Sequence, residues 1–146
     1  MALAKQAKIL TKAQQDAVLG LIASSRYPLR NRVIFLLSVK AGLRAKEIAS
    51  LTWAMVTDVE GNVSDSLTLT NIASKGNSGG RAIPMSRDLR AAISNWKVEA
   101  DSASRQSSYV VTTERSPRTS SYAVVNLFAD WYHALGFVGA SMIGPV

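Results

Sequence analysis

Apolar side chains recur at helical intervals through the first third of the chain. In residues 11–25 they lie three and four positions apart, and Thr11 with Gln14 has the spacing of a capping box. A dense apolar segment follows Pro28, which suits the first turn of a helix, and Gly42 is placed to end that helix. The pattern predicts two helices here, followed by a short third one.

The period then changes from helical to alternating. Residues 66–72 alternate polar and apolar side chains, and residues 81–85 form a second apolar segment after a glycine-rich turn. This pattern predicts a small antiparallel sheet with a flexible hairpin. Val56 and Val63 flank a further turn. The short apolar segment 109–111 is predicted as another strand.

Two longer amphipathic segments complete the pattern. One predicted helix begins at Ser86 or Arg87, and the last begins at Ser120 or Ser121 and ends at Gly136. The order of helices, small sheet and helices predicts an α+β fold that is mainly helical. A length of 146 residues without a long linker predicts a single domain.

Composition excludes several kinds of chemistry. The chain has no cysteine, so disulfides, thiolate metal sites and cysteine nucleophiles are excluded. Its one histidine, His133, gives no basis for a multi-histidine site, and we expect no metal and no cofactor. Neither a signal peptide nor an apolar run long enough to span a membrane is apparent. We therefore expect a cytoplasmic protein with no membrane partner.

Charge points to a polyanionic partner. The 17 Lys and Arg residues outnumber the 10 Asp and Glu residues, which gives a net charge of +7. Residues 26–46 contain six basic residues and no acidic one, and a second basic group consists of Lys75, Arg81, Arg87 and Arg90. This clustering is typical of a nucleic-acid-binding surface.

The segment 40–53, KAGLRAKEIASLTW, is the most informative one. It predicts the short third helix over 45–51, with Arg44 at its start and Glu47 on the same face. An outward-pointing guanidinium of this kind can hold a phosphate through two parallel hydrogen bonds. The alternative is a surface Arg44–Glu47 pair contributing about 0.2–0.5 kcal/mol. Spacing alone favours the surface pair.

Two motifs carry a resemblance to a known family. Gly-Leu-Arg-x-x-Glu-Ile-x-x-Leu-x-Trp, beginning at Gly42, resembles the first arginine box of the tyrosine recombinases, or phage integrases. The later SKGNSGGRAIPM resembles the hairpin whose lysine enters the active site of that family. The two motifs occur in the order and at about the spacing of the family. The resemblance extends over about 11–141 and implies a fold like that of the tyrosine recombinase catalytic domain.

The resemblance also implies a chemistry. In this family a tyrosine attacks a DNA phosphodiester and forms a phosphotyrosyl link without a metal or nucleotide cofactor. Arg44 matches the arginine that stabilises charge on the phosphoryl oxygens, Glu47 the acid that supports it, and Lys75 the lysine that protonates the departing oxygen. The implied partner is the DNA backbone, and the expected contacts are Arg44, Lys46, Lys75, Arg81 and Lys40.

The end of the chain departs from the family pattern. The phrase VGAS resembles the approach to a His-x-x-Arg box, but residues 142–146 read Met-Ile-Gly-Pro-Val. Every tyrosine precedes that position, so none matches the nucleophile: Tyr27, Tyr109, Tyr122 and Tyr132. His133 is expected to be a partly buried structural residue. We therefore expect a single partial catalytic domain over 1–146, with an N-terminal tail of about ten residues, that does not cleave DNA alone.

Three hypotheses remain open at this point. In the first, the chain is a catalytically incomplete integrase-like domain: a remnant of a mobile element, the product of a frameshift, or a regulator that binds DNA or a full-length recombinase. Alternatively, it is a non-enzymatic DNA-binding module in which Arg44 and Lys75 only contact phosphates. A third hypothesis is a protein-interaction module, because apolar surface around Leu127, Trp131 and Leu135 would favour self-association or partner capture.

Overall fold

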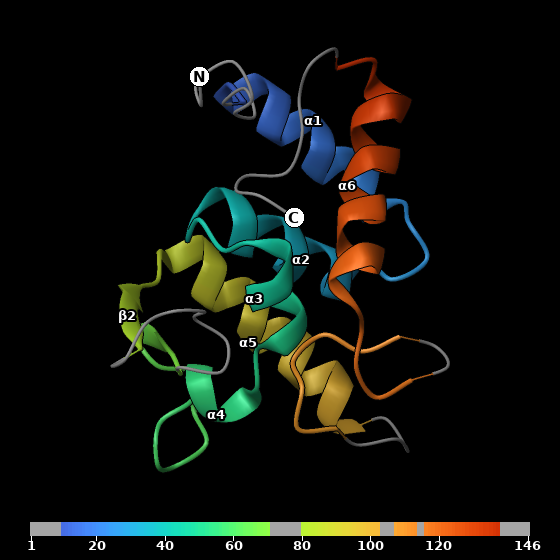
Figure 1. Cartoon of the computed structure of the whole chain (residues 1–146). Coiled ribbons are helices and arrows are strands. Elements are labelled where there is room, and N and C mark those ends of the chain that lie inside the picture. The colour runs from blue at the N-terminus through green and yellow to red at the C-terminus, as the bar shows by residue number, and fades with distance from the viewer. Residues whose placement is uncertain (1–9, 71–79, 103–106, 114–115, 138–146) are drawn as a thin grey trace.

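The computed structural model describes residues 10–70, 80–102, 107–113 and 116–137. Along the chain the elements are α1 (Lys12–Ala23), α2 (Pro28–Val39), α3 (Ala45–Ser50), α4 (Trp53–Val56), β1 (Ser66–Leu69), β2 (Arg81–Pro84), α5 (Arg87–Ser102) and α6 (Ser121–Leu135). Figure 1 shows that helices form most of the molecule and that the strands lie to one side of them. The predicted α+β fold, mainly helical with a small antiparallel sheet, is confirmed.

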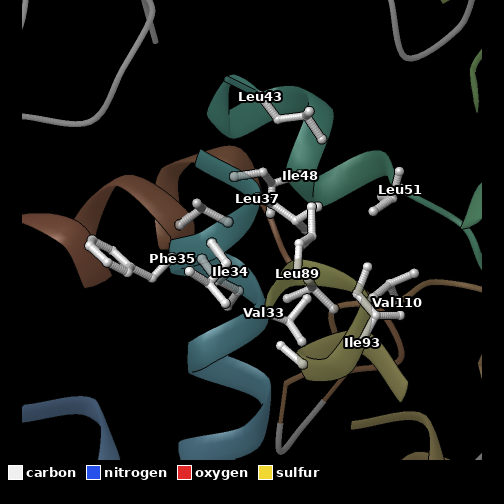
Figure 2. Close-up of a cluster of buried hydrophobic side chains, with 14 of the residues drawn as sticks. Val33, Ile34, Phe35, Leu37, Leu43, Ile48, Leu51, Leu89, Ile93 and Val110 are labelled. Atoms are coloured by element: carbon white, nitrogen blue, oxygen red, sulfur yellow. The ribbon is translucent and has the colours of Figure 1, made fainter. Parts of the chain in front are cut away.

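Helix α2 is the central element and contacts α1, α3 and α5. Its residues from Val33 to Ser38 are all buried, which is why the sequence there is apolar on every face. Figure 2 shows the resulting cluster, to which α3 contributes Ile48 and α5 contributes Leu89 and Ile93. Each such side chain stabilises the fold by about 1.5–3 kcal/mol when fully buried. The core therefore fixes α3, whose N-terminal end carries Arg44, against α2.

Ring contacts attach α6 to the central helix. The ring of Phe128 lies 6.0 Å from that of Phe35 in α2 and 5.0 Å from that of Trp131, measured between centroids. Trp131 meets Phe35 edge-on at 6.2 Å. Tilted and edge-on pairs of this kind each add about 0.5–1.5 kcal/mol beyond the burial of their area. The aromatic residues of α6 are therefore core residues.

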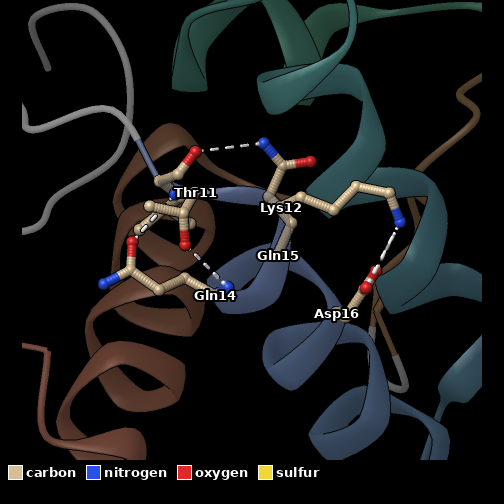
Figure 3. Close-up of polar contacts among 6 residues, drawn as sticks. Thr11, Lys12, Gln14, Gln15 and Asp16 are labelled. Carbon is tan, nitrogen blue, oxygen red and sulfur yellow. Dashed lines mark hydrogen bonds and ion pairs between the residues drawn. The ribbon is translucent and has the colours of Figure 1, made fainter.

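Local signals set the helix ends as predicted. The side chain of Thr11 accepts a hydrogen bond from the backbone N–H of Gln14 at 3.1 Å, and the Gln14 side chain accepts one from the N–H of Thr11 at 2.9 Å (Figure 3). Pro28 occupies the first turn of α2. After α2, Gly42 adopts a φ of 71°, and its N–H donates to the carbonyl of Ser38. This left-handed turn ends the helix and directs the chain into α3.

The sheet consists of β1 and β2 paired antiparallel, with Leu67 opposite Ile83 and Leu69 opposite Arg81. Leu67 and Leu69 are buried, whereas β2 is mostly exposed. The predicted alternation is confirmed over 66–69. Residues 71 and 72 of the predicted strand lie outside the described residues, as does the hairpin tip.

Two features of the fold differ from the sequence prediction. Residues 109–111 form no strand: Tyr109 makes one isolated bridge with Thr52. The backbone of Val110 instead bonds to two other parts of the chain: its N–H donates to the carbonyl of Leu51, just after α3, and its carbonyl accepts from the indole N–H of Trp96 in α5 at 2.7 Å. The one-turn helix α4 was also not predicted, because four residues carry too little periodicity to show it.

Candidate nucleic-acid interface

Arg44 lies at the boundary between the left-handed turn and α3. Its backbone is extended, with φ −80° and ψ 162°, and its neighbours Leu43 and Ala45 are buried. These two anchors leave the Arg44 side chain exposed. Its guanidinium has no hydrogen-bond or ion-pair partner within the part of the chain that the structure describes. Arg44 is therefore placed as the outward-pointing guanidinium that the first box predicts.

Glu47 has a different environment from the one predicted for a surface pair. The residue is buried, and its Oε1 accepts a hydrogen bond from the backbone N–H of Arg44 at 2.9 Å. Its Oε2 accepts from Nη2 of Arg81 at 2.8 Å. The alternative of an exposed Arg44–Glu47 side-chain pair is therefore wrong, because the carboxylate holds the main chain of Arg44 and the side chain of Arg81.

Arg81 was expected to contact DNA, and the structure pairs it with Glu47. It is the first residue of β2, and 41% of its side-chain surface remains exposed. This pairing could not be predicted from the sequence, because the two residues are 34 positions apart. The one available signal was the position of Glu47 as the third residue of α3. An acid at this position accepts a hydrogen bond from the backbone N–H of the capping residue. If the acid is also buried, its charge needs a nearby cation.

Gly80 sets the position of Arg81. Its φ is 74°, and a Cβ atom at this residue would lie 2.2 Å from the carbonyl oxygen of Leu69. Only glycine allows β2 to begin this close to the end of β1. The close approach brings Arg81 into register opposite Leu69 at the end of the sheet.

The remaining predicted contacts divide into two groups. Lys46 in α3 and Lys40 at the end of α2 are exposed, and no ion pair of either side chain occurs within the described ranges. With Arg44 they supply three basic side chains from one short stretch of chain. Lys75 lies outside the described residues, so its predicted role stays a prediction.

Arg30 belongs to the same basic segment but is a structural residue. Its guanidinium donates to the carbonyl of Thr112 at 2.9 Å and to the side chain of Asn31, and it lies 4.7 Å from the ring centroid of Tyr27. The pKa of Arg30 is lowered from its ordinary value, because the effect of burial exceeds the opposite effect of the nearby Tyr27. Arg30 therefore ties α2 to the segment 107–113.

Comparison with known proteins identifies the family. The sequence pattern of the phage integrase family matches residues 8–142. The chain belongs to the phage integrase family. The resemblance inferred from the two motifs is thereby confirmed. Comparison with curated protein sequences gives no match.

The fold is similar to that of several solved recombinases and integrases. The crystal structure of XerA recombinase matches with a TM-score of 0.71 and 16% identity over 90% of this chain and 45% of that one. A lambda integrase tetramer bound to a Holliday junction matches with a TM-score of 0.63 and 17% identity over 93% of this chain and 38% of that one. The Tn1549 transposon integrase in complex with circular intermediate DNA matches with a TM-score of 0.59 and 18% identity over 95% of this chain and 47% of that one. The chain thus has the recombinase fold and spans under half the length of these structures.

The tyrosines of this integrase-family chain occupy contrasting environments. Tyr132 is buried, with its ring 6.0 Å from those of Phe128 and Phe137, and burial raises its pKa to about 12. A buried phenol that resists ionisation is poorly suited to attack a phosphate. Tyr109 packs beneath Arg118 at 4.4 Å, whereas Tyr122 is exposed.

Two expectations for α6 are corrected by the structure. His133 was expected to be partly buried, and it is exposed because it faces away from the aromatic side of the helix. Trp131 was expected to lie in an exposed apolar patch with Leu127 and Leu135, and it is buried against Phe35. Leu127 and Leu135 are half-buried. Leu127 lines a hollow of about 240 Å³ that also includes Arg30 and Asp130.

The described residues support neither a metal site nor a membrane segment. Within them no three His, Cys, Asp or Glu side chains are grouped so that they could bind a metal ion. Among the same residues, every helix is too short or too polar to cross a bilayer.

Proposed function

We propose that this chain is a single partial catalytic domain of a DNA integrase, and that it binds the DNA backbone through the surface around Arg44. The exposed, unpaired guanidinium of Arg44, next to a backbone that Glu47 holds in place, is the observation that carries this proposal. Lys46 and Lys40 add positive charge beside it. Such a surface attracts phosphates and gives binding that weakens as salt is added. The family match and the DNA complexes named for lambda and Tn1549 integrases support this function.

Within that function each site residue has a proposed role. Arg44 stabilises the negative charge that develops on the phosphoryl oxygens during strand cleavage. Glu47 supports Arg44, and Lys75 donates a proton to the departing oxygen. No metal or nucleotide cofactor is needed for these steps. We further propose that the domain acts in the cytoplasm, with DNA and either a second copy or a full-length recombinase as partners.

DNA binding is tested by fluorescence anisotropy with a labelled duplex over a range of salt concentrations. Replacing Arg44 by Ala should weaken binding on all sequences and lower the salt slope by about one unit. Lys12→Ala is a suitable control, because it removes the same charge from α1, where Lys12 pairs with Asp16 at 3.2 Å. Equal losses for the two variants would show that only net charge matters and that Arg44 forms no site.

Cleavage is tested with a nicked suicide DNA substrate followed by denaturing electrophoresis. We expect no covalent adduct with this chain alone, because Tyr132 is buried and the chain has no residue that matches the family nucleophile. An adduct that disappears when one of the tyrosines is replaced by Phe would overturn the proposed inability to cleave.

A further inference from the structure

Glu47 connects two parts of the chain that are far apart in sequence. Only 8% of its side-chain surface is exposed, and each carboxylate oxygen has a different partner. Oε1 accepts from the backbone N–H of Arg44, and Oε2 accepts from Nη2 of Arg81. A single buried carboxylate thus joins the start of α3 to the start of β2.

The burial of Glu47 makes Arg81 necessary for this connection. A carboxylate removed from water is unfavourable unless a cation and hydrogen bonds compensate it. Arg81 supplies the opposite charge, and its guanidinium donates to the oxygen that Arg44 does not use. Without that charge, we expect the Glu47 side chain to turn towards water and release the N–H of Arg44.

Both ends of this connection are fixed by packing. Leu43 and Ala45 hold the chain on either side of Arg44, and Gly80 brings β2 against Leu69 just before Arg81. Because the two backbones are anchored, the carboxylate has little freedom except to rotate away. Its pairing with Arg81 therefore decides whether the backbone at Arg44 is held.

We propose that Arg81 is a positioning residue, and that its contribution to DNA binding acts through Glu47 on Arg44 rather than through a phosphate contact of its own. This inference takes one premise from the proposed function, which is that Arg44 contacts DNA. The paired state of Arg81 and the burial of Glu47 carry it. The proposal thus gives Arg81 a different role from Lys40 and Lys46, whose exposed side chains are proposed to contact phosphate directly.

The first experiment is a double-mutant cycle in DNA affinity with the full chain. We expect Arg81→Gln to weaken binding about threefold to tenfold in the native background, and less than about twofold when Arg44 is already Ala. Two independent phosphate contacts would instead give losses that multiply, and each substitution would lower the salt slope by about one unit. Multiplying losses would overturn the proposal.

The second experiment requires no DNA. Hydrogen exchange of the Arg44 amide, followed by NMR, reports directly on the bond to Oε1 of Glu47. We expect Arg81→Gln to speed this exchange at least about fivefold, as expected when a local hydrogen bond opens. Arg81→Lys, which keeps the charge, should restore most of the protection and most of the DNA affinity.

Arg90→Gln is the matched control for both experiments. Arg90 is exposed to the same extent as Arg81 and pairs with Asp65 at 2.9 Å, but it does not touch Glu47. The Arg90→Gln substitution should leave the rate of hydrogen exchange at the Arg44 amide unchanged. If exchange of the Arg44 amide is unchanged in Arg81→Gln as well as in Arg81→Lys, the positioning role is overturned, whatever the DNA-binding measurements show. Faster exchange without DNA binding by the native chain would instead reject the proposed function and leave the positioning role in place.

Discussion

Two Arg–carboxylate ion pairs, one near each end of the two-stranded sheet, have the same chemistry and different surroundings. Arg81 in β2 pairs with Glu47 at 2.8 Å, and Arg90 in α5 pairs with Asp65, just before β1, at 2.9 Å. The two arginine side chains are equally exposed, at 41%. The carboxylates differ, because the Glu47 side chain is 8% exposed and that of Asp65 is 93% exposed.

This difference shows that the environment of the acid decides what such a pair does. Asp65 is solvated whether or not Arg90 is present, so the pair is a typical surface interaction contributing about 0–1 kcal/mol. Glu47 has lost its water and also holds the backbone of Arg44. Loss of Arg81 would leave a buried charge without compensation, so the same substitution should have different consequences at the two sites.

The largest expected effect is on stability. We expect Arg81→Gln to lower the free energy of unfolding by about 1–3 kcal/mol, less than the 3–5 kcal/mol typical of a fully buried pair, because Arg81 is partly solvated. Arg90→Gln should change it by less than about 1 kcal/mol. Urea denaturation of both variants measures the difference. Equal values would show that the burial of Glu47 does not distinguish the two pairs.

A smaller effect is expected in the coupling within each pair. A double-mutant cycle of Glu47→Gln with Arg81→Gln should give a coupling of about 1–2 kcal/mol, and the cycle of Asp65→Asn with Arg90→Gln about 0.5 kcal/mol or less. Chemical denaturation of the single and double variants provides both numbers. A stronger coupling at Asp65 would reverse the comparison.

Added salt should increase the difference between the coupling free energies of the two pairs. At about 1 M salt the Debye length is about 3 Å, so the exposed Asp65–Arg90 coupling should fall by at least about half. The Glu47–Arg81 coupling should change little, since the carboxylate is shielded from solvent ions. Repeating the two cycles at about 0.05 M and 1 M sodium chloride tests this. Parallel losses at both pairs would contradict it.

The smallest effect concerns the identity of the cation. Arg81→Lys should cost about 0.5–1 kcal/mol, because an ammonium cannot reproduce the planar guanidinium at a buried acceptor. Arg90→Lys should lie within about 0.3 kcal/mol of the native protein, since a solvated carboxylate accepts either cation. Thermal denaturation of the two lysine variants is the measurement. A larger loss at position 90 would indicate that Arg90 has a packing role.

The candidate site was predicted only in part from the sequence. The box around Arg44 placed this residue at a helix start and Glu47 one turn later, and the structure agrees on both positions. The sequence did not indicate that Glu47 would be buried or that Arg81 would be its partner. Residues in one turn are brought together by the helix itself, whereas residues 34 positions apart meet only after tertiary folding has brought β2 close to α3.

The fold shows the same division between local and long-range interactions. The capping box at Thr11, Pro28 in the first turn of α2 and Gly42 after it act within a few residues, so the sequence by itself determined where these helices begin and end. Residues 109–111 had a strand-like pattern, but the hydrogen bonds of Val110 were decided by Leu51 and Trp96, which lie far from it in the sequence. The tertiary structure likewise decided that Trp131 is buried and His133 exposed, because burial depends on which surface another element covers.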